Sequence, residues 1–299
     1  MSTAPQFPIY IVSKGRADTR FSSRMFERYG VRYHIVVEQQ EAEQYRAAVD
    51  PALGTVLVLD PAYQRDYDTF DTLGDSKGKG PGPARNFAWD HSMLVHGAAW
   101  HWVCDDNVKD FYRLHQNRRI HMDCGVAMRC MEDFCLRYRN VGMAGPQYFM
   151  FAPSRGPKSG GVWPAFVTNT RIYSFNLIRN DVPFRWRGRY NEDTDLSLRM
   201  LKAKWCTVQF NAFLQHKLPT QTVKGGNTEE FYAREGTLAK SRMQVAMHPD
   251  VSRMLWRFNR VHHLVDYRPF RINKLALRDG VVICAGVDDY GLTLQDVQA

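Results

Sequence analysis

The strongest constraint on the fold is the alternation of apolar, β-rich runs with helix-like segments over the first 60 residues. The runs at 7–12, 33–37 and 55–59 predict strands, and 18–29 and 38–48 predict helices. This alternation is typical of α/β proteins with a mainly parallel, Rossmann-like sheet flanked by helices. Ligands of such sheets bind beyond the carboxyl ends of the strands. We therefore expect Ser13, Gly15 and Arg16, which follow the first strand, to line a binding crevice; a purely structural turn is the alternative.

A later apolar run, residues 100–104, ends abruptly in Asp105, Asp106 and Asn107. Adjacent carboxylates are costly inside a strand, so this cluster is expected at a strand end that faces solvent or a cation. Hard oxygen ligands suit Mg²⁺ or Mn²⁺, which usually bridge a protein to the phosphates of a substrate. The pattern predicts a metal site here, and a polar strand end followed by a turn is the alternative.

Composition bounds the class of protein. The 299 residues are 44% hydrophobic, which excludes wholesale disorder, and no apolar run approaches the roughly 20 residues that a membrane span needs. The six cysteines form no Cys-x-x-Cys pair, so we expect a reducing, cytoplasmic environment. The net charge of +9, with basic residues densest after residue 216, favours a polyanionic partner such as a nucleotide or nucleic acid.

Two further stretches carry candidate chemistry. A loop rich in glycine and proline leads into a helix predicted to begin near Ala84, where Arg85 and Asn86 would contact a phosphate or nucleotide, or simply cap the surface. Downstream, Asn191 is expected to cap a helix whose first turn holds three acidic residues. These acidic residues are Glu192, Asp193 and Asp195.

The acidic first turn allows two interpretations. The carboxylates would stabilise the helix dipole by their position alone. Alternatively, Asp193 would act as a general base toward a hydroxyl group, with Glu192 and Asp195 orienting the acceptor. His216, at the end of a late predicted strand, is a candidate further metal ligand, with a structural role as the alternative.

Taken together, these features resemble the GT-A glycosyltransferases, and more specifically the TET-associated glycosyltransferases of bacteriophages. The resemblance spans residues 8–270 and rests on several short segments in order. These are Gly-Pro-Ala-Arg-Asn from 82, Cys-Asp-Asp-Asn from 104, the Trp-Arg-Gly-Arg-Tyr-Asn-Glu-Asp-Thr-Asp run from 186, Lys-Gly-Gly-Asn-Thr from 224, Glu-Gly-Thr-Leu-Ala-Lys-Ser from 235 and His-His-Leu-Val-Asp-Tyr from 262.

The resemblance implies transfer of a sugar from a UDP-sugar onto the hydroxymethyl group of 5-hydroxymethylcytosine or 5-hydroxymethyluracil in phage DNA. Residues expected at the nucleotide are Ser13, Gly15, Arg16, Arg85 and Asn86. Those expected to hold Mn²⁺ or Mg²⁺ and the diphosphate are Asp105, Asp106, Asn107 and His216. Asn107 stands where the motif usually ends in Asp, so the ligand set would bring one negative charge fewer to the metal ion.

The same resemblance assigns roles to the C-terminal part. Lys224, Gly225 and Gly226 would form a loop that closes over the diphosphate, a surface turn being the alternative. DNA would contact a basic stretch, and aromatic side chains would stack on an extruded base unless they belong to the core. The predicted DNA contacts are Trp186, Arg187, Arg189, Arg253, Arg257 and Arg260.

We therefore predict a GT-A catalytic domain over residues 1–216 and a helical, basic extension over 217–299 that completes the donor loop and the acceptor surface. A base at Asp193 would invert the anomeric configuration; in the alternative, a retaining route, Asp193 would instead bind the acceptor. Two other interpretations stay open: a GT-A transferase with a non-DNA acceptor, and a non-catalytic DNA-binding module.

Overall fold

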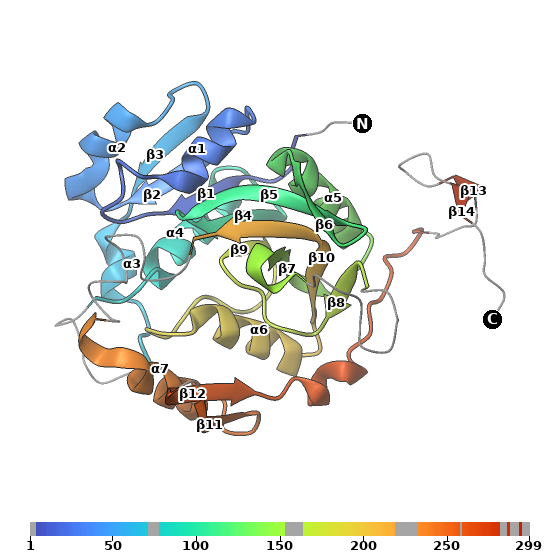
Figure 1. Ribbon diagram of the computed structural model, residues 1–299. Coiled ribbons are helices and arrows are strands. Elements are labelled where there is room, and N and C mark those ends of the chain that lie inside the picture. The colour runs from blue at the N-terminus through green and yellow to red at the C-terminus, as the bar shows by residue number, and fades with distance from the viewer. Residues whose placement is uncertain are drawn as a thin grey trace.

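The computed structural model describes residues 4–70, 78–152, 164–218, 233–257, 259–281, 286–287 and 293–294. Within these residues a mixed sheet of ten strands forms the centre, in the order β3-β2-β1-β4-β9-β7-β10-β5-β6, with β8 paired to β10 (Figure 1). Helices flank the sheet, and the α/β fold class predicted from the alternating pattern is confirmed.

The N-terminal part of the sheet is parallel, as predicted. β1 (Ile9–Val12) lies between β2 (Tyr33–Val37) and β4 (Trp100–Asp105), and β2 pairs with β3 (Gly54–Val58). The connections hold α1 (Phe21–Arg28), a 3₁₀ turn (Gln39–Glu41) with α2 (Ala42–Ala48), and α3 (Pro61–Arg65). In register, Val12 stands beside Asp105, so the carboxyl ends of β1 and β4 meet at one edge.

The remaining strands make the sheet mixed. β9 (Phe175–Arg179) runs antiparallel between β4 and β7 (Val141–Tyr148), and β7 pairs in parallel with the long β10 (Cys206–Lys217). β5 (Val108–His115), β6 (Arg118–Met122) and β8 (Phe166–Thr168) add antiparallel pairs. A 3₁₀ turn, Phe149–Phe151, follows the end of β7.

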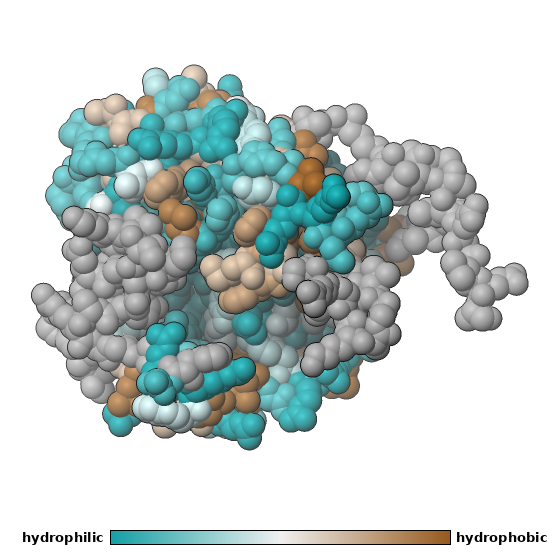
Figure 2. Space-filling model, viewed as in Figure 1, coloured by the Kyte–Doolittle hydropathy of each residue, from teal (hydrophilic) through white to brown (hydrophobic). Residues whose placement is uncertain are grey.

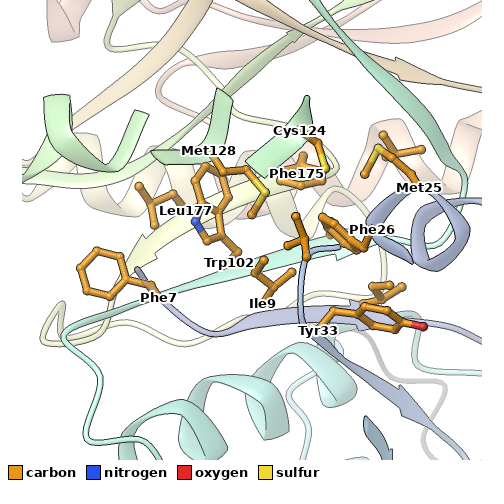
Figure 3. Close-up of a cluster of buried hydrophobic side chains, with 14 of the residues drawn as sticks. Phe7, Ile9, Met25, Phe26, Tyr33, Trp102, Cys124, Met128, Phe175 and Leu177 are labelled. Atoms are coloured by element: carbon orange, nitrogen blue, oxygen red, sulfur yellow. The ribbon is translucent and has the colours of Figure 1, made fainter. Parts of the chain in front are cut away.

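Three longer helices cover the sheet: α4 (Gly82–Leu94), α5 (Cys124–Leu136) and α6 (Glu192–Lys202). Buried apolar clusters lie on both faces of the sheet, and Figure 3 shows the one that joins Ile9, Trp102, Met128 and Phe175. Because β1 and β4 are buried on both faces, their sequences are continuously apolar rather than alternating.

The described residues from 233 to 272 form a second layer, which packs on α6 and on the segment before it. α7 (Ala233–Met247) places Met243 and Met247 against Tyr190, and Val251 and Phe270 pack on α6. In the described part of the extension the only α-helix is α7, and residues 252–257 and 260–265 form an antiparallel hairpin (Figure 1). The hairpin consists of β11 (Ser252–Arg257) and β12 (Arg260–Val265), and a 3₁₀ turn (Arg268–Ile272) and a short pair, β13 (Gly286–Val287) and β14 (Thr293–Leu294), follow.

None of the helices in the described part of the chain combines the length and the apolar character that crossing a bilayer requires. The proposed division of the chain at residue 216 stays a prediction.

Candidate active site

The residues that follow β1 meet the end of β4 through polar contacts. The Ser13 hydroxyl donates to Asp106 at 2.7 Å and also meets the Tyr45 hydroxyl at 2.6 Å. The Arg16 guanidinium forms an ion pair with the same Asp106. Gly15 adopts a left-handed backbone conformation, φ 67°, which a glycine reaches without strain, and its N–H donates to Glu41. The structure therefore brings Ser13, Gly15, Arg16 and Asp106 together.

Arg85, on the first turns of α4, is almost fully buried, with 1% of its side chain exposed. It donates to Asp105 at 2.8 Å, to Glu192 at 3.2 Å and to Asp193. Burial by itself lowers the pKa of Arg85, but the three carboxylates more than offset this, and its pKa is raised. The predicted contact with a nucleotide is thus replaced by an internal one, because the guanidinium is surrounded by carboxylates.

Asn86 is likewise committed inside the protein. Its side chain donates to the Trp186 carbonyl at 3.0 Å and accepts from the Trp186 N–H at 2.9 Å. The side-chain amide thus makes the same two hydrogen bonds to the backbone that a neighbouring strand would make. These bonds tie α4 to the segment before α6. This placement differs from the predicted nucleotide contact.

Lys217, which the sequence analysis did not single out, completes the cluster. Its ammonium donates to Asp105 at 2.6 Å and to the Ser174 hydroxyl at 2.7 Å. Burial alone would raise the pKa of Asp105, but the charges of Lys217 and Arg85 lower it well below its usual range. The signal in the sequence that could have identified Lys217 is its position directly after His216, a predicted metal ligand. We call Asp105, Glu192 and Asp193, with Arg85 and Lys217, the carboxylate cluster.

The start of α6 supplies two of the three partly accessible carboxylates of this cluster, and Asp105 is the third. The side chains of Glu192 and Asp193 are 14% and 13% exposed. Asp193 contacts Arg85 and also accepts the Ser174 N–H at 3.4 Å, whereas Glu192 contacts Arg85 through one oxygen. Burial, and then the charge of Asp193, raise the pKa of Glu192 to about 7. Burial also raises the pKa of Asp193.

Asn191 does not cap α6 as predicted. Its backbone is left-handed, φ 56°, and its side-chain amide instead donates to the Lys240 carbonyl at 2.9 Å. Because a left-handed Ncap residue turns its side chain away from the first N–H groups, the amide instead ties α6 to α7.

Asp195 lies one turn deeper and is fully buried. Arg187 at 3.1 Å, Arg199 at 2.7 Å and His248 at 3.0 Å surround it. Burial raises its pKa, but these partners lower it overall. Asp195 thus has no surface to offer an acceptor, and its role is to hold the segment before α6 and the end of α7 in place.

The residues predicted to bind a metal ion do not form a ligand set. Asp105 is neutralised by Arg85 and Lys217, and Asp106 by Arg16. Asn107 is buried and donates to the Leu218 carbonyl at 3.4 Å; its Oδ1 has no partner in the described structure, but a single amide oxygen does not make a metal site.

His216, the fourth predicted ligand, lies elsewhere. Its ring stacks on Phe149, with centroids 4.7 Å apart, and meets the edge of Tyr112. Across the described residues, no three histidine, cysteine or acidic side chains are grouped as a metal ion requires. The donor chemistry therefore does not fit Mn²⁺ or Mg²⁺.

The predicted DNA contacts divide into two groups. Trp186 is 2% exposed and lies under the Arg85 guanidinium, so it belongs to the core and cannot stack on a base. Arg189 is also buried, and Arg187 pairs with Asp195. Burial makes Trp186 and Arg189 structural, whereas Arg187 is 28% exposed and is engaged with the buried Asp195.

The other three arginines lie on the hairpin and are exposed. Arg253 and Arg257 are four residues apart on β11, and Arg257 stands directly opposite Arg260, so all three share one face. Trp256, which we had not predicted as a contact, is 71% exposed on the opposite face of the hairpin. Lys224, Gly225 and Gly226 lie outside the described residues.

Figure 2 shows a recess in the middle of the viewed face, between the central sheet and the layer of α7, β11 and β12.

Comparison with known proteins identifies the family. A family model described as TET-Associated Glycosyltransferase matches residues 7–226, which include every strand of the central sheet and the whole carboxylate cluster. No curated protein matches the chain. The α/β fold is consistent with the GT-A architecture, and the enzyme is a glycosyltransferase. The chain belongs to the TET-associated glycosyltransferase family.

Proposed function

We propose that the enzyme transfers a sugar from a UDP-sugar to the hydroxymethyl group of 5-hydroxymethylcytosine or 5-hydroxymethyluracil in DNA, as in the modified DNA of bacteriophages, in the cytoplasm of the host cell. The observation that carries the proposal is the pair of partly accessible carboxylates, Glu192 and Asp193, held by a buried arginine in a chain of this family. Such a pair suits proton transfer from an acceptor hydroxyl.

The donor nucleotide is assigned to the edge of the sheet at the ends of β1 and β4. Ser13, Gly15 and Arg16 follow β1, and open α/β sheets bind nucleotides beyond the carboxyl ends of their strands. Arg16 is 12% exposed and pairs with Asp106, which fixes its guanidinium at this edge. We propose no role for Mn²⁺ or Mg²⁺, because Arg16, Arg85 and Lys217 already neutralise the carboxylates that were predicted to bind the metal ion.

The acceptor is assigned to Glu192 and Asp193. A general base works best when its pKa lies near the operating pH, and the pKa of Glu192, about 7, meets that condition. Glu192 also uses only one oxygen on Arg85, whereas Asp193 uses both of its oxygens on protein partners. We therefore transfer the role of base, first assigned to Asp193, to Glu192; direct displacement would invert the anomeric configuration.

DNA is assigned to the hairpin. Like charges directly opposite each other destabilise a strand pair, and Arg257 and Arg260 are placed in that way. The exposed arginines attract an anionic DNA backbone, and Trp256, on the other face of the hairpin, offers an exposed ring on which a base can stack. Chemistry on a base in duplex DNA generally requires that the base leave the stack.

Mass spectrometry of nucleosides tests the reaction. DNA containing 5-hydroxymethylcytosine or 5-hydroxymethyluracil is incubated with the protein and a panel of UDP-sugars, and the nucleosides are then released. We expect a mass gain of one sugar with one donor. Glu192→Gln should abolish the gain, whereas the matched change at an exposed glutamate, Glu43→Gln, should leave it intact.

The other outcomes separate the alternatives. Donor hydrolysis without any mass gain would move the acceptor away from DNA bases. DNA binding without turnover of any donor would favour a binding module.

A further inference from the structure

Sugar transfer places negative charge on the leaving diphosphate, and cationic groups of the carboxylate cluster are positioned to neutralise that charge. When the donor is cleaved, the bond from the anomeric carbon to the β-phosphate oxygen breaks and its electron pair stays on that oxygen. The acceptor oxygen forms the new bond, and its proton passes to the carboxylate of α6. Negative charge therefore grows on the diphosphate, and a fixed positive charge nearby lowers the barrier.

Lys217 supplies such a charge at the first carboxylate of the predicted metal motif. Its ammonium uses two of its three N–H groups, on Asp105 and on Ser174. Among the described residues the third N–H meets no protein acceptor, and 14% of the side chain is exposed, so this N–H can reach a ligand. Lys217 can therefore donate to an anion without releasing Asp105.

The charges around Lys217 keep it in this place. Burial by itself lowers its pKa, but the charge of Asp105 raises it above the usual value for lysine, so the side chain remains protonated at neutral pH. Ser174, which receives one of its N–H groups, is in turn fixed by the Tyr148 hydroxyl at 2.7 Å. The ammonium is thus held by two neighbours, Asp105 at the end of β4 and Ser174 directly before β9.

The same arrangement disfavours a divalent cation. A metal ion at Asp105 would lie beside the Lys217 ammonium and the Arg85 guanidinium, which repel it, and would compete with both for the same two oxygens. Asp106 cannot replace Asp105 as a ligand without losing Arg16.

We propose that Lys217 takes the place of the divalent metal ion of GT-A enzymes and stabilises the leaving nucleoside diphosphate, so that donor binding and turnover need no added metal. This inference rests on the proposed function for the identity of the donor.

Binding of UDP by calorimetry is the first test, because it requires no acceptor. Metal-free protein in EDTA should bind UDP with an affinity within about threefold of that measured in Mn²⁺. Lys217→Met should weaken binding by at least tenfold, and Lys217→Arg should recover part of the loss. The matched change at the exposed Lys204, Lys204→Met, should have no effect.

Turnover and folding complete the test. Sugar transfer should persist in EDTA, and Lys217→Met should lower kcat while its far-UV circular dichroism remains that of a folded protein. UDP binding that appears only with Mn²⁺ or Mg²⁺ would overturn this inference alone. Absence of UDP binding under both conditions would overturn the proposed donor and this inference with it.

Discussion

The carboxylate cluster and the hairpin are both rich in charged side chains, but the cationic side chains are largely buried in the cluster and exposed on the hairpin. In the cluster, Arg85 and Lys217 are buried and each meets a carboxylate within 2.8 Å. On the hairpin, the arginines are exposed, and two of them face each other across the strands. Buried, paired charges keep a fixed orientation, whereas exposed ones attract a partner at a distance. The first arrangement suits catalysis and the second suits binding.

Arg85→Met should have the largest effect, because it leaves three carboxylates without their shared partner. Breaking a buried ion pair costs about 3–5 kcal/mol in the free energy of unfolding. Urea denaturation followed by circular dichroism measures the change. Arg253→Met, on the hairpin, should stay within about 0.5 kcal/mol, as surface substitutions do. Similar losses for the two variants would erase the distinction between the regions.

Glu192→Gln should lower kcat about 10²–10⁴-fold, the usual contribution of a general base. The pH profile sharpens the assignment. Because the base must be ionised, the activity of the wild-type enzyme should fall as the pH drops through about 7, the pKa of Glu192. The residual activity of the glutamine variant should lose this acidic limb. An acidic limb that instead vanishes in Asp193→Asn and survives in Glu192→Gln would return the role of base to Asp193.

Removal of the three hairpin arginines should weaken DNA binding without affecting UDP binding. The expected signature is the salt dependence: the slope of log K against log salt should become less steep by roughly 0.9 for each lost phosphate contact. Fluorescence anisotropy with labelled DNA over a range of salt concentrations measures it. Arg46→Ala, at an exposed arginine of α2, is the control. An unchanged slope in the triple variant would place DNA elsewhere.

Trp256→Ala tests the smallest effect, because one stacked base contributes about 1–3 kcal/mol. We expect an affinity for DNA about tenfold lower, with the thermal unfolding midpoint unchanged, since the ring is 71% exposed. Trp186→Ala should show the reverse, a loss of stability, because that ring is 2% exposed. Unaltered DNA affinity in the Trp256 variant would limit the hairpin to phosphate contacts.

The α/β class and the parallel start of the sheet were predictable from the sequence, because the periods of strands and helices are local properties. The continuous apolar run at 100–104 identified a buried strand, and the polar residues after it identified its end. The sequence also drew attention to Glu192 and Asp193 as consecutive carboxylates at a helix start, and the structure places both beside Arg85.

The partners of these residues were decided by tertiary structure alone. Whether Arg85 meets a phosphate or three carboxylates depends on how α4 packs against α6, which are about 100 residues apart in the chain. Likewise, the pairing of β10 with β5 and β7 turned Lys217 toward Asp105 and left His216 on Phe149. Local sequence determined which residues carry charge and where strands end; long-range packing decided which charges neutralise one another, because Coulomb interactions follow distance in space and not separation along the chain.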